Sequence, residues 1–214
     1  IVKNDALAIA TQVASALTHA HSHGVIHRDI KPENILFQAG QAVVADFGIA
    51  RAISAGGWEE KHLVGGPVGT PTYMSPEQAQ GGSRVDGRSD VYSLGCVLYE
   101  MLAGVPPFRG TTPEEIAVQH QEATPPPVNI VRPTLPASMQ QVVSRALEKL
   151  PADRYQTAQQ LADALARLPM DPPAGGSMAS APPRRRSLAE RVQQAPRGWG
   201  VFGVAAAGIA ILVY

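Results

Sequence analysis

The chain has 214 residues, which is enough for one sizeable domain and a smaller segment. Lysine plus arginine and aspartate plus glutamate both number 18, so the formal net charge is zero, which argues against a dedicated nucleic-acid binder. The single cysteine, Cys96, cannot form an internal disulfide or a cysteine-rich metal site, so we expect it to pack in the core of a protein from a reducing compartment.

The first predicted element is a helix that Asn4 or Asp5 can cap and that runs to about His21. Small and apolar residues recur at helical spacing and would form its buried face: Ala6, Ile9, Ala10, Val13, Ala16, Leu17 and Ala20. Gly24 is expected to end the helix, because glycine readily adopts the left-handed conformation found after a helix C-terminus.

Histidines crowd the end of this helix. His19 and His23 are four residues apart, which is a spacing that can hold a metal ion on a helix. No acidic or thiol ligand lies nearby in register, so a structural role is favoured over a metal site.

A stretch of mixed charge follows the helix. It reads His27-Arg28-Asp29-Ile30-Lys31-Pro32-Glu33-Asn34-Ile35-Leu36, and Asp46-Phe47-Gly48 comes soon after. Ile35–Gln38 and Ala42–Ala45 are predicted to be two short strands that hold Asn34 at one end and Asp46 at the other. Phosphoryl transfer needs a carboxylate to orient the attacking hydroxyl, oxygen ligands for magnesium and a cation on the moving phosphate, and this stretch carries all three.

The rest of the first 168 residues predicts a loop followed by helices. Residues 49–68 are rich in glycine and poor in apolar anchors, so they form the predicted loop. Helices are expected at residues 86–103, 113–121 with Thr112 as cap, 137–150 and 157–168, with a proline-rich extended stretch at residues 123–136.

The composition changes after Leu168. Residues 169–197 are rich in proline, glycine and arginine and predict a flexible linker. Residues 198–214 carry no charge and predict a transmembrane helix that the end of the sequence cuts short; a buried C-terminal helix is the less favoured alternative. Arg184–Arg186 beside this run favour anionic lipid over nucleic acid as partner and place the preceding domain in the cytoplasm. Gly198–Gly203 matches G-x-G-x-x-G but follows no strand, so it is not read as a phosphate loop.

The stretch at residues 27–36, which we call the catalytic stretch, and the tripeptide Asp46-Phe47-Gly48 closely resemble the catalytic and metal loops of the protein kinase family. Three further segments match the family's landmarks: Gly69-Thr70-Pro71-Thr72-Tyr73-Met74-Ser75-Pro76-Glu77, Asp90-Val91-Tyr92-Ser93-Leu94-Gly95 and Pro151-Ala152-Asp153-Arg154-Tyr155. The resemblance implies a mainly α fold, a kinase C-terminal lobe with a short β-hairpin over residues 1–168. The family's N-terminal lobe, with its glycine-rich loop and strand lysine, is not found in the sequence, so the fragment alone is expected to be inactive or nearly so.

The resemblance also implies roles for individual residues. It implies that Asp29 is the catalytic base, that Lys31 binds the γ-phosphate and that Thr70 contacts both residues. The remaining ATP-binding residues are Glu33, Asn34, Leu36 under the adenine, and Asp46, of which Asn34 and Asp46 bind Mg²⁺. Structural roles fall to Asp90, which accepts the backbone N–H groups of His27 and Arg28, and to a buried ion pair of Glu77 with Arg154.

Arg28 before Asp29 is typical of kinases that need a phosphorylated activation loop. Between Ile49 and Val68, however, the only hydroxyl residue is Ser54, so standard loop autophosphorylation is not expected. One hypothesis is that Glu59 or Glu60 supplies part of the missing charge; a solvated acidic pair is at least as well supported. Replacing both with glutamine in the complete kinase, with no change in activity, would disprove the hypothesis.

The sequence as a whole resembles bacterial-type (eukaryotic-like) serine/threonine protein kinases. This resemblance implies ATP and Mg²⁺ as cofactors, protein Ser/Thr hydroxyls as substrates, and a receptor-like parent that crosses the cell membrane once with a cytoplasmic kinase domain. A homodimer through Gly203 and Ala207 rests on a weak pattern. One alternative function is a pseudokinase that acts as a membrane scaffold, which is disfavoured because Asp29, Lys31, Asn34 and Asp46 are all present. Another is a small-molecule phosphotransferase, which is disfavoured because residues 69–77 resemble a segment that binds peptide substrates.

Overall fold

The computed structural model describes residues 2–47, 71–81 and 85–169. The predictions for the loop at residues 49–68, for Thr70, and for the linker and apolar segment from residue 170 onward lie outside these residues. Among the described residues, no helix combines the length and the apolar character needed to cross a bilayer.

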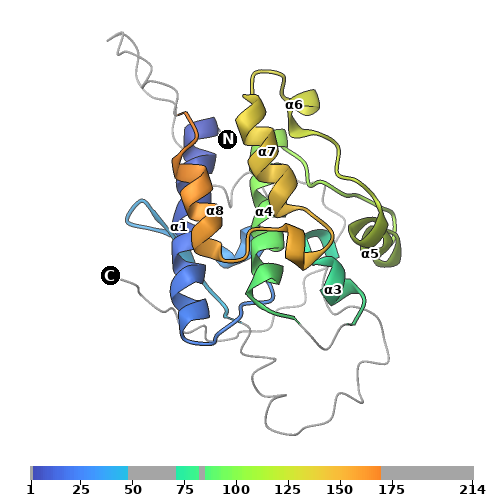
Figure 1. Ribbon diagram of the computed structural model, residues 1–214, viewed down its shortest axis with the longest axis horizontal. Helices are drawn as coiled ribbons and strands as arrows, with labels where there is room; N and C mark the ends of the chain where they lie inside the picture. The colour runs from blue at the N-terminus through green and yellow to red at the C-terminus, as the bar shows by residue number, and fades with distance from the viewer. Residues whose placement is uncertain (1, 48–70, 82–84, 170–214) are drawn as a thin grey trace, which may run out of the picture.

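The core is built from four helices that lie side by side (Figure 1). Helix α1, Lys3–Ser22, packs against α8, Ala158–Ala166, and against α4, Gly87–Ala103, whose other contacts include α7, Ala137–Ala146. Almost every side chain of α4 is buried, as the apolar sequence of that helix predicts. Cys96 lies in α4 and is buried, which confirms its predicted packing role.

Helix α1 begins earlier than predicted. Its N-cap is Val2, which makes no side-chain capping bond, so the expectation that Asn4 or Asp5 caps the helix was wrong. Asp5 instead lies in the first turn, where a carboxylate favours the helix dipole. At the other end Gly24 has φ +75°, and the Gly24 and Val25 N–H groups donate to the carbonyls of His21 and Ala20, both at 3.0 Å. This is the predicted glycine stop.

The predicted hairpin is present. Strand β1, Ile35–Gln38, pairs antiparallel with β2, Gln41–Val44. The two-residue turn at Ala39 and Gly40 has φ +48° and +84°, as a tight hairpin turn requires, so β2 starts one residue earlier than expected. The Ala42 N–H donates to Gln12 Oε1 of α1 at 2.6 Å, which fixes the hairpin to the core.

Helix α4 begins one residue later than predicted and ends where predicted. Asp86 caps it by accepting the Arg88 N–H at 2.9 Å, and Gly104 with φ +81° ends it. Gly95 in its middle faces α7, where an added Cβ would lie 2.9 Å from Ala146 Cβ. The glycine therefore permits the close approach of these two helices.

Further helices and turns lie outside this group of four helices. Helix α5, Pro113–Glu122, is capped by Thr112 as predicted, but the stretch expected to be extended contains the short helix α6, Val128–Val131. The other short elements are the 3₁₀ turns η1 Pro32–Asn34, η4 Pro71–Tyr73 and η5 Pro151–Asp153, and the helix α3 Pro76–Ala79.

Helix α7 stops at Ala146, four residues before its predicted end. In the residues that follow, the carbonyls of Glu148 and Lys149 accept hydrogen bonds from Arg154. Helix α8 is shorter than predicted at both ends, with Thr157 as its N-cap rather than its first residue.

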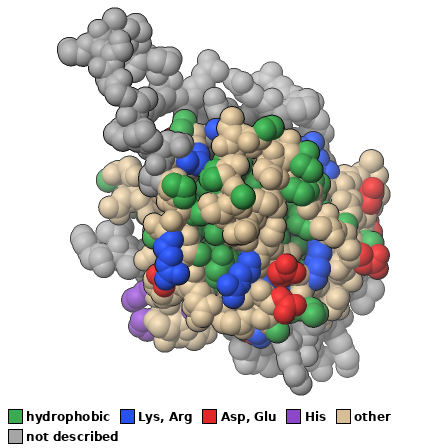
Figure 2. Space-filling view, turned by 45° about the horizontal axis from the view of Figure 1, so that its top comes forward, with side chains coloured by type: hydrophobic (Ala, Val, Ile, Leu, Met, Phe, Trp, Pro, Cys, Tyr) green, Lys and Arg blue, Asp and Glu red, His purple; other side chains and the backbone are tan. Residues whose placement is uncertain are grey.

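On the face shown in Figure 2, basic and acidic side chains are interspersed rather than gathered by sign.

Candidate active site

Asp90 of α4 organises the backbone of the catalytic stretch. Its Oδ2 accepts the His27 N–H at 2.9 Å and its Oδ1 accepts the Arg28 N–H at 2.7 Å, so both predicted contacts are present. The His21 ring supplies a further contact, with Nε2 at 2.7 Å from Oδ2. Asp90 is fully buried, and a buried carboxylate needs several such partners to offset its lost hydration.

Arg28 holds an uncommon backbone conformation, with φ +67°. Its N–H is bound by Asp90, and its carbonyl accepts a hydrogen bond from Gln78 Nε2 at 2.8 Å. Asp46 has φ +58°, so both loops of the site contain a non-glycine residue in the left-handed region. Such conformations persist where the surroundings fix them, and they gather at functional sites.

His27 links the two loops of the site. Its ring is buried, and Nε2 lies 2.9 Å from the Ala45 carbonyl oxygen. Nδ1 accepts the Asp29 N–H at 3.2 Å. Because a backbone N–H can only donate, Nδ1 is the acceptor and Nε2 carries the proton. The ring also packs against Phe47, with centroids 4.8 Å apart. The residues just before and after Asp46 are therefore both fixed to the catalytic stretch.

Asp29 is the centre of a small polar cluster. Lys31 Nζ lies 2.7 Å from Asp29 Oδ2, and Asn34 Nδ2 donates to the Asp29 carbonyl at 2.8 Å and to Oδ2 at 3.1 Å. The Asp29 side chain is 56% exposed, so its oriented carboxylate faces solvent and can meet a hydroxyl. Such an arrangement can orient a nucleophile while a cation stands beside it.

Two oxygen donors lie next to this cluster. The amide nitrogen of Asn34 is engaged by Asp29, which leaves the amide oxygen for a cation. The Ala45 N–H donates to the Asn34 carbonyl at 2.9 Å, which brings exposed Asp46 close to Asn34. Amide and carboxylate oxygens suit Mg²⁺, which usually takes only one or two protein side chains and completes its shell with phosphate and water, so these residues fit the metal.

Among the residues that the structure describes, no group of three or more His, Cys, Asp or Glu side chains is placed so that it could hold a metal ion. His19 and His23 instead stack, with ring centroids 4.5 Å apart.

The two other predicted ATP contacts lie on the surface beside the cluster. Leu36 on β1 is 50% exposed, next to Phe37 at 48%, so the hairpin presents an apolar surface. Glu33 in η1 is also exposed.

Pro71–Gln78, which we call the platform segment, is fixed to the core at several points. The Tyr73 hydroxyl donates to Glu100 Oε2 of α4 at 2.5 Å. Ser75 and Gln78 form a reciprocal capping box at the start of α3. Since Gln78 also binds the Arg28 carbonyl, the platform segment and the catalytic stretch are positioned together.

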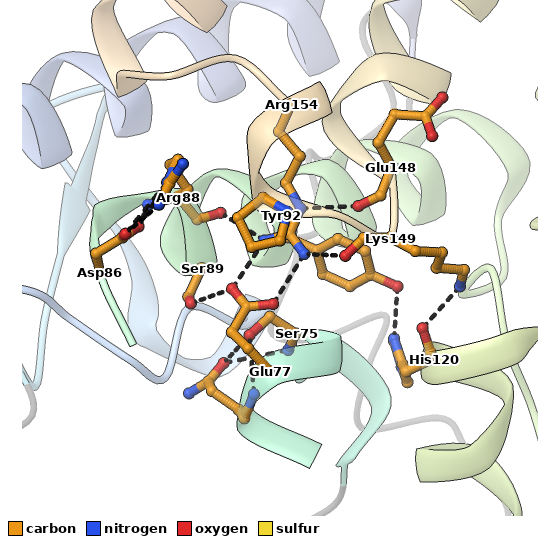
Figure 3. Close-up of polar contacts among 12 residues, drawn as sticks. Ser75, Glu77, Asp86, Arg88, Ser89, Tyr92, His120, Glu148, Lys149 and Arg154 are labelled. Atoms are coloured by element: carbon orange, nitrogen blue, oxygen red, sulfur yellow. Dashed lines mark hydrogen bonds and ion pairs between the residues drawn. The ribbon is translucent and has the colours of Figure 1, made fainter. Parts of the chain in front are cut away.

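Glu77 and Arg154 form the predicted ion pair (Figure 3). The guanidinium is bidentate, with Nη1 and Nη2 both 2.8 Å from the two Glu77 oxygens. Its other N–H groups donate to the carbonyls of Arg88, Glu148 and Lys149, so every donor of this fully buried side chain is used. Burial raises the pKa of Glu77, but hydrogen bonds from Arg154 and Ser89 outweigh it and keep the pKa below its usual value.

Sequence reasoning missed three residues of this framework: His21 on Asp90, Gln78 on Arg28, and His120, which binds the Thr72 carbonyl. Each joins segments at least 48 residues apart. For Gln78, the unused signal is the Ser75-x-x-Gln pattern, which is typical of a capping box but does not indicate the second partner.

Comparison with known proteins gives one consistent family. A model of the protein kinase domain matches residues 1–165. Serine/threonine-protein kinase PknB of Mycobacterium tuberculosis (strain ATCC 25618 / H37Rv) is 48% identical over 164 residues, which are 76% of this chain and 26% of that protein. PknB of Mycobacterium leprae is 42% identical over 200 residues, 93% of this chain and 31% of the relative. The probable serine/threonine-protein kinase CPE1738 of Clostridium perfringens is 44% identical over 169 residues, 78% of this chain and 24% of the relative. The chain thus spans only 24–31% of the length of these relatives.

Proposed function

Because the chain belongs to the protein kinase family, we propose that its parent protein transfers the γ-phosphate of ATP to Ser or Thr hydroxyls of proteins. The observation that carries this proposal is the Asp29–Lys31–Asn34 cluster, which is held by Asp90 beneath it and by the platform segment beside it. Lysine two residues after the catalytic aspartate, together with the names of the relatives, supports Ser/Thr as the acceptor.

In this proposal Asp29 orients the acceptor hydroxyl and takes its proton, while Lys31 leaves its contact with Asp29 to bind the γ-phosphate. Asn34 and Asp46 would hold Mg²⁺, which when bound would neutralise charge on the phosphates. Leu36 packs under the adenine, and Glu33 belongs to the same ATP-binding group.

The roles of the residues farther from the phosphates are also part of the proposal. The proposal gives Thr70, which lies outside the described residues, a catalytic role beside Asp29 and Lys31. It gives the structural role of keeping the loops of the site in place to His27, Arg28, Glu77, Asp90 and Arg154.

We extend the proposal to the organisation of the parent. Residues 1–168 form the kinase C-terminal lobe, 169–197 a linker and 198–214 part of a single membrane-spanning helix. The arginines at 184–186 keep the kinase in the cytoplasm and contact anionic lipid, and two copies pair through the apolar helix. Alkaline carbonate extraction of cells that express the parent tests this organisation: recovery in the soluble fraction would contradict it.

The catalytic test compares the parent with an Asp29→Asn variant, using Mg-ATP and a protein substrate. We expect kcat to fall about 10²- to 10⁴-fold, because the general base is lost. Asp163→Asn, at an exposed position on α8, is the matched control and should leave kcat unchanged. If Asp29→Asn had the activity of the parent, the proposed role of Asp29 would be wrong.

The same assay distinguishes a kinase from a scaffold. A parent that bound partner proteins but transferred no phosphate would be a pseudokinase. The 214 residues alone should transfer little phosphate. ATP could contact the hairpin surface at Leu36, but the 214 residues contain no glycine-rich loop before the catalytic stretch to cover its phosphates. Ordinary turnover by the 214-residue chain would contradict this expectation.

A further inference from the structure

A buried histidine joins three elements beside the platform segment. His120, at the end of α5, is fully buried. Its Nδ1 lies 2.9 Å from the Tyr92 hydroxyl of α4, and its Nε2 lies 3.1 Å from the Thr72 carbonyl of the platform segment. A carbonyl can only accept, so Nε2 carries the proton and Nδ1 accepts from Tyr92. One neutral ring therefore connects α4, α5 and the platform segment.

The position of this ring is itself fixed. Lys149 Nζ donates to the carbonyls of His120 and Gln119 at 2.7 and 3.2 Å, which satisfies the C-terminal end of α5 (Figure 3). The same ammonium lies 4.3 Å from the centre of the Phe108 ring, and Phe108 packs edge-on against His120 at 4.8 Å. Burial, and then the charge of Lys149, lower the pKa of His120 to about 4, which keeps the ring neutral at physiological pH.

The Thr72 contact matters because the platform segment has no strand partner in the described structure. Glu77 and Gln78 hold its C-terminal part, whereas its N-terminal part is held by the Tyr73 hydroxyl on Glu100 and the Thr72 carbonyl on His120. Without the imidazole donor, the Thr72 carbonyl would lose its bond at this partly buried junction, and the backbone would shift to find another partner.

We propose that His120 is a positioning residue for the protein substrate: it holds the Thr72 carbonyl so that the platform segment presents a fixed surface to the peptide beside Asp29. This inference rests on the proposed kinase function. It assigns His120 no contact with the substrate and no role in the chemical step.

Two substitutions separate this role from simple packing. In His120→Gln the amide nitrogen can occupy the place of Nε2 and donate to Thr72, whereas in His120→Asn the shorter side chain reaches only the place of Nδ1, near Tyr92. Both variants replace a ring by a smaller amide and lose its packing. Glu122→Gln, an exposed change on the same helix, is the control.

The experiment measures KM for a Ser/Thr peptide and KM for ATP with the parent protein. We expect His120→Asn to raise the peptide KM about tenfold and to change the ATP KM less than about twofold, whereas His120→Gln restores a peptide KM near that of the parent. An unchanged peptide KM in His120→Asn, or equal rises in both variants, would overturn the inference.

Hydrogen exchange of the platform segment provides a readout that does not depend on catalysis. The amides of residues 72–78 should exchange faster in His120→Asn than in His120→Gln, and equal exchange would overturn the positioning role. A parent that transfers no phosphate, but shows this difference in exchange, would refute the proposed function while leaving the structural role of His120 established.

Discussion

At the scale of single residues, Arg154 illustrates how this fold tolerates a buried charge. The side chain is fully buried, its five N–H groups all have acceptors, and it lies 4.8 Å from the centre of the Tyr92 ring. The desolvation penalty of a buried ion pair can equal its Coulombic gain, so the pair need not add net stability. Its removal is costly for a different reason, since one partner is then left unpaired.

Replacing Arg154 with methionine should therefore lower the free energy of unfolding by about 3–5 kcal/mol, because Glu77 loses its bidentate partner and three carbonyls lose their donor. Arg154→Lys should also be strongly destabilising, since an ammonium cannot reproduce the planar fork. Urea unfolding gives the size of both effects.

The surface pair of Arg88 with Asp86 provides the comparison. Arg88→Ala should cost no more than about 1 kcal/mol, because the pair is partly exposed and screened by water. Similar losses in Arg154→Met and Arg88→Ala would contradict the argument that burial sets the cost.

At the scale of elements, helices and their stops were largely predictable from the sequence because the information is local. Thr112 before Pro113 and glycines such as Gly104 indicate helix ends through the backbone groups they satisfy or the φ angles they allow. Helix α7, by contrast, ends before its predicted end, and the residues after it place the carbonyls of Glu148 and Lys149 on Arg154, a contact that no local pattern indicates.

Gly95 is a position where local propensity and tertiary packing oppose each other. Alanine is a better helix former than glycine by about 1 kcal/mol, so propensity alone predicts that Gly95→Ala stabilises α4. The new methyl group, however, would lie 2.9 Å from Ala146 Cβ and 3.2 Å from Leu147 Cδ2. We expect a net loss of about 1–3 kcal/mol, measured by urea unfolding, because overpacking forces the helices apart.

A double substitution tests this cause. Gly95→Ala together with Ala146→Gly should recover part of the loss, since the second change removes the facing methyl group, and the two effects should be non-additive. Strict additivity would mean that the contact between α4 and α7 does not produce the loss.

At the scale of the whole molecule, the candidate site could be named from motifs, but not the network that holds it. The motifs predicted that Asp90 binds the catalytic stretch and that Glu77 meets Arg154, and both contacts are present. Nothing local in the sequence places His120 on Thr72, because the two are brought together only when α5 packs beside the platform segment. Such contacts nevertheless affect a property of the whole molecule, its stability as a function of pH.

His120 should make the protein less stable in mild acid. Its pKa is about 4 in the folded protein, where burial and Lys149 disfavour the charged ring, against roughly 6.5 when unfolded. Between these values the unfolded chain binds more protons, so the free energy of unfolding falls as pH falls. The stabilisation from the neutral ring is complete above about pH 6.5, and its loss on reaching pH 4 amounts to roughly 3 kcal/mol. Glu77, whose pKa is lowered, loses its contribution only at still lower pH.

Urea unfolding at a series of pH values between 4.5 and 7 measures this slope. His120→Gln should flatten it, because glutamine cannot take up the proton. An equal slope in His120→Gln and the parent would mean that His120 accepts its proton in the folded state and that the Thr72–His120–Tyr92 connection tolerates a charged ring. Down to about pH 4 the ring in the folded protein stays neutral, so stability should fall over a range in which the Thr72 contact persists. A charged ring would still donate from Nε2 to Thr72 and would lose only its Nδ1 acceptor for the Tyr92 hydroxyl.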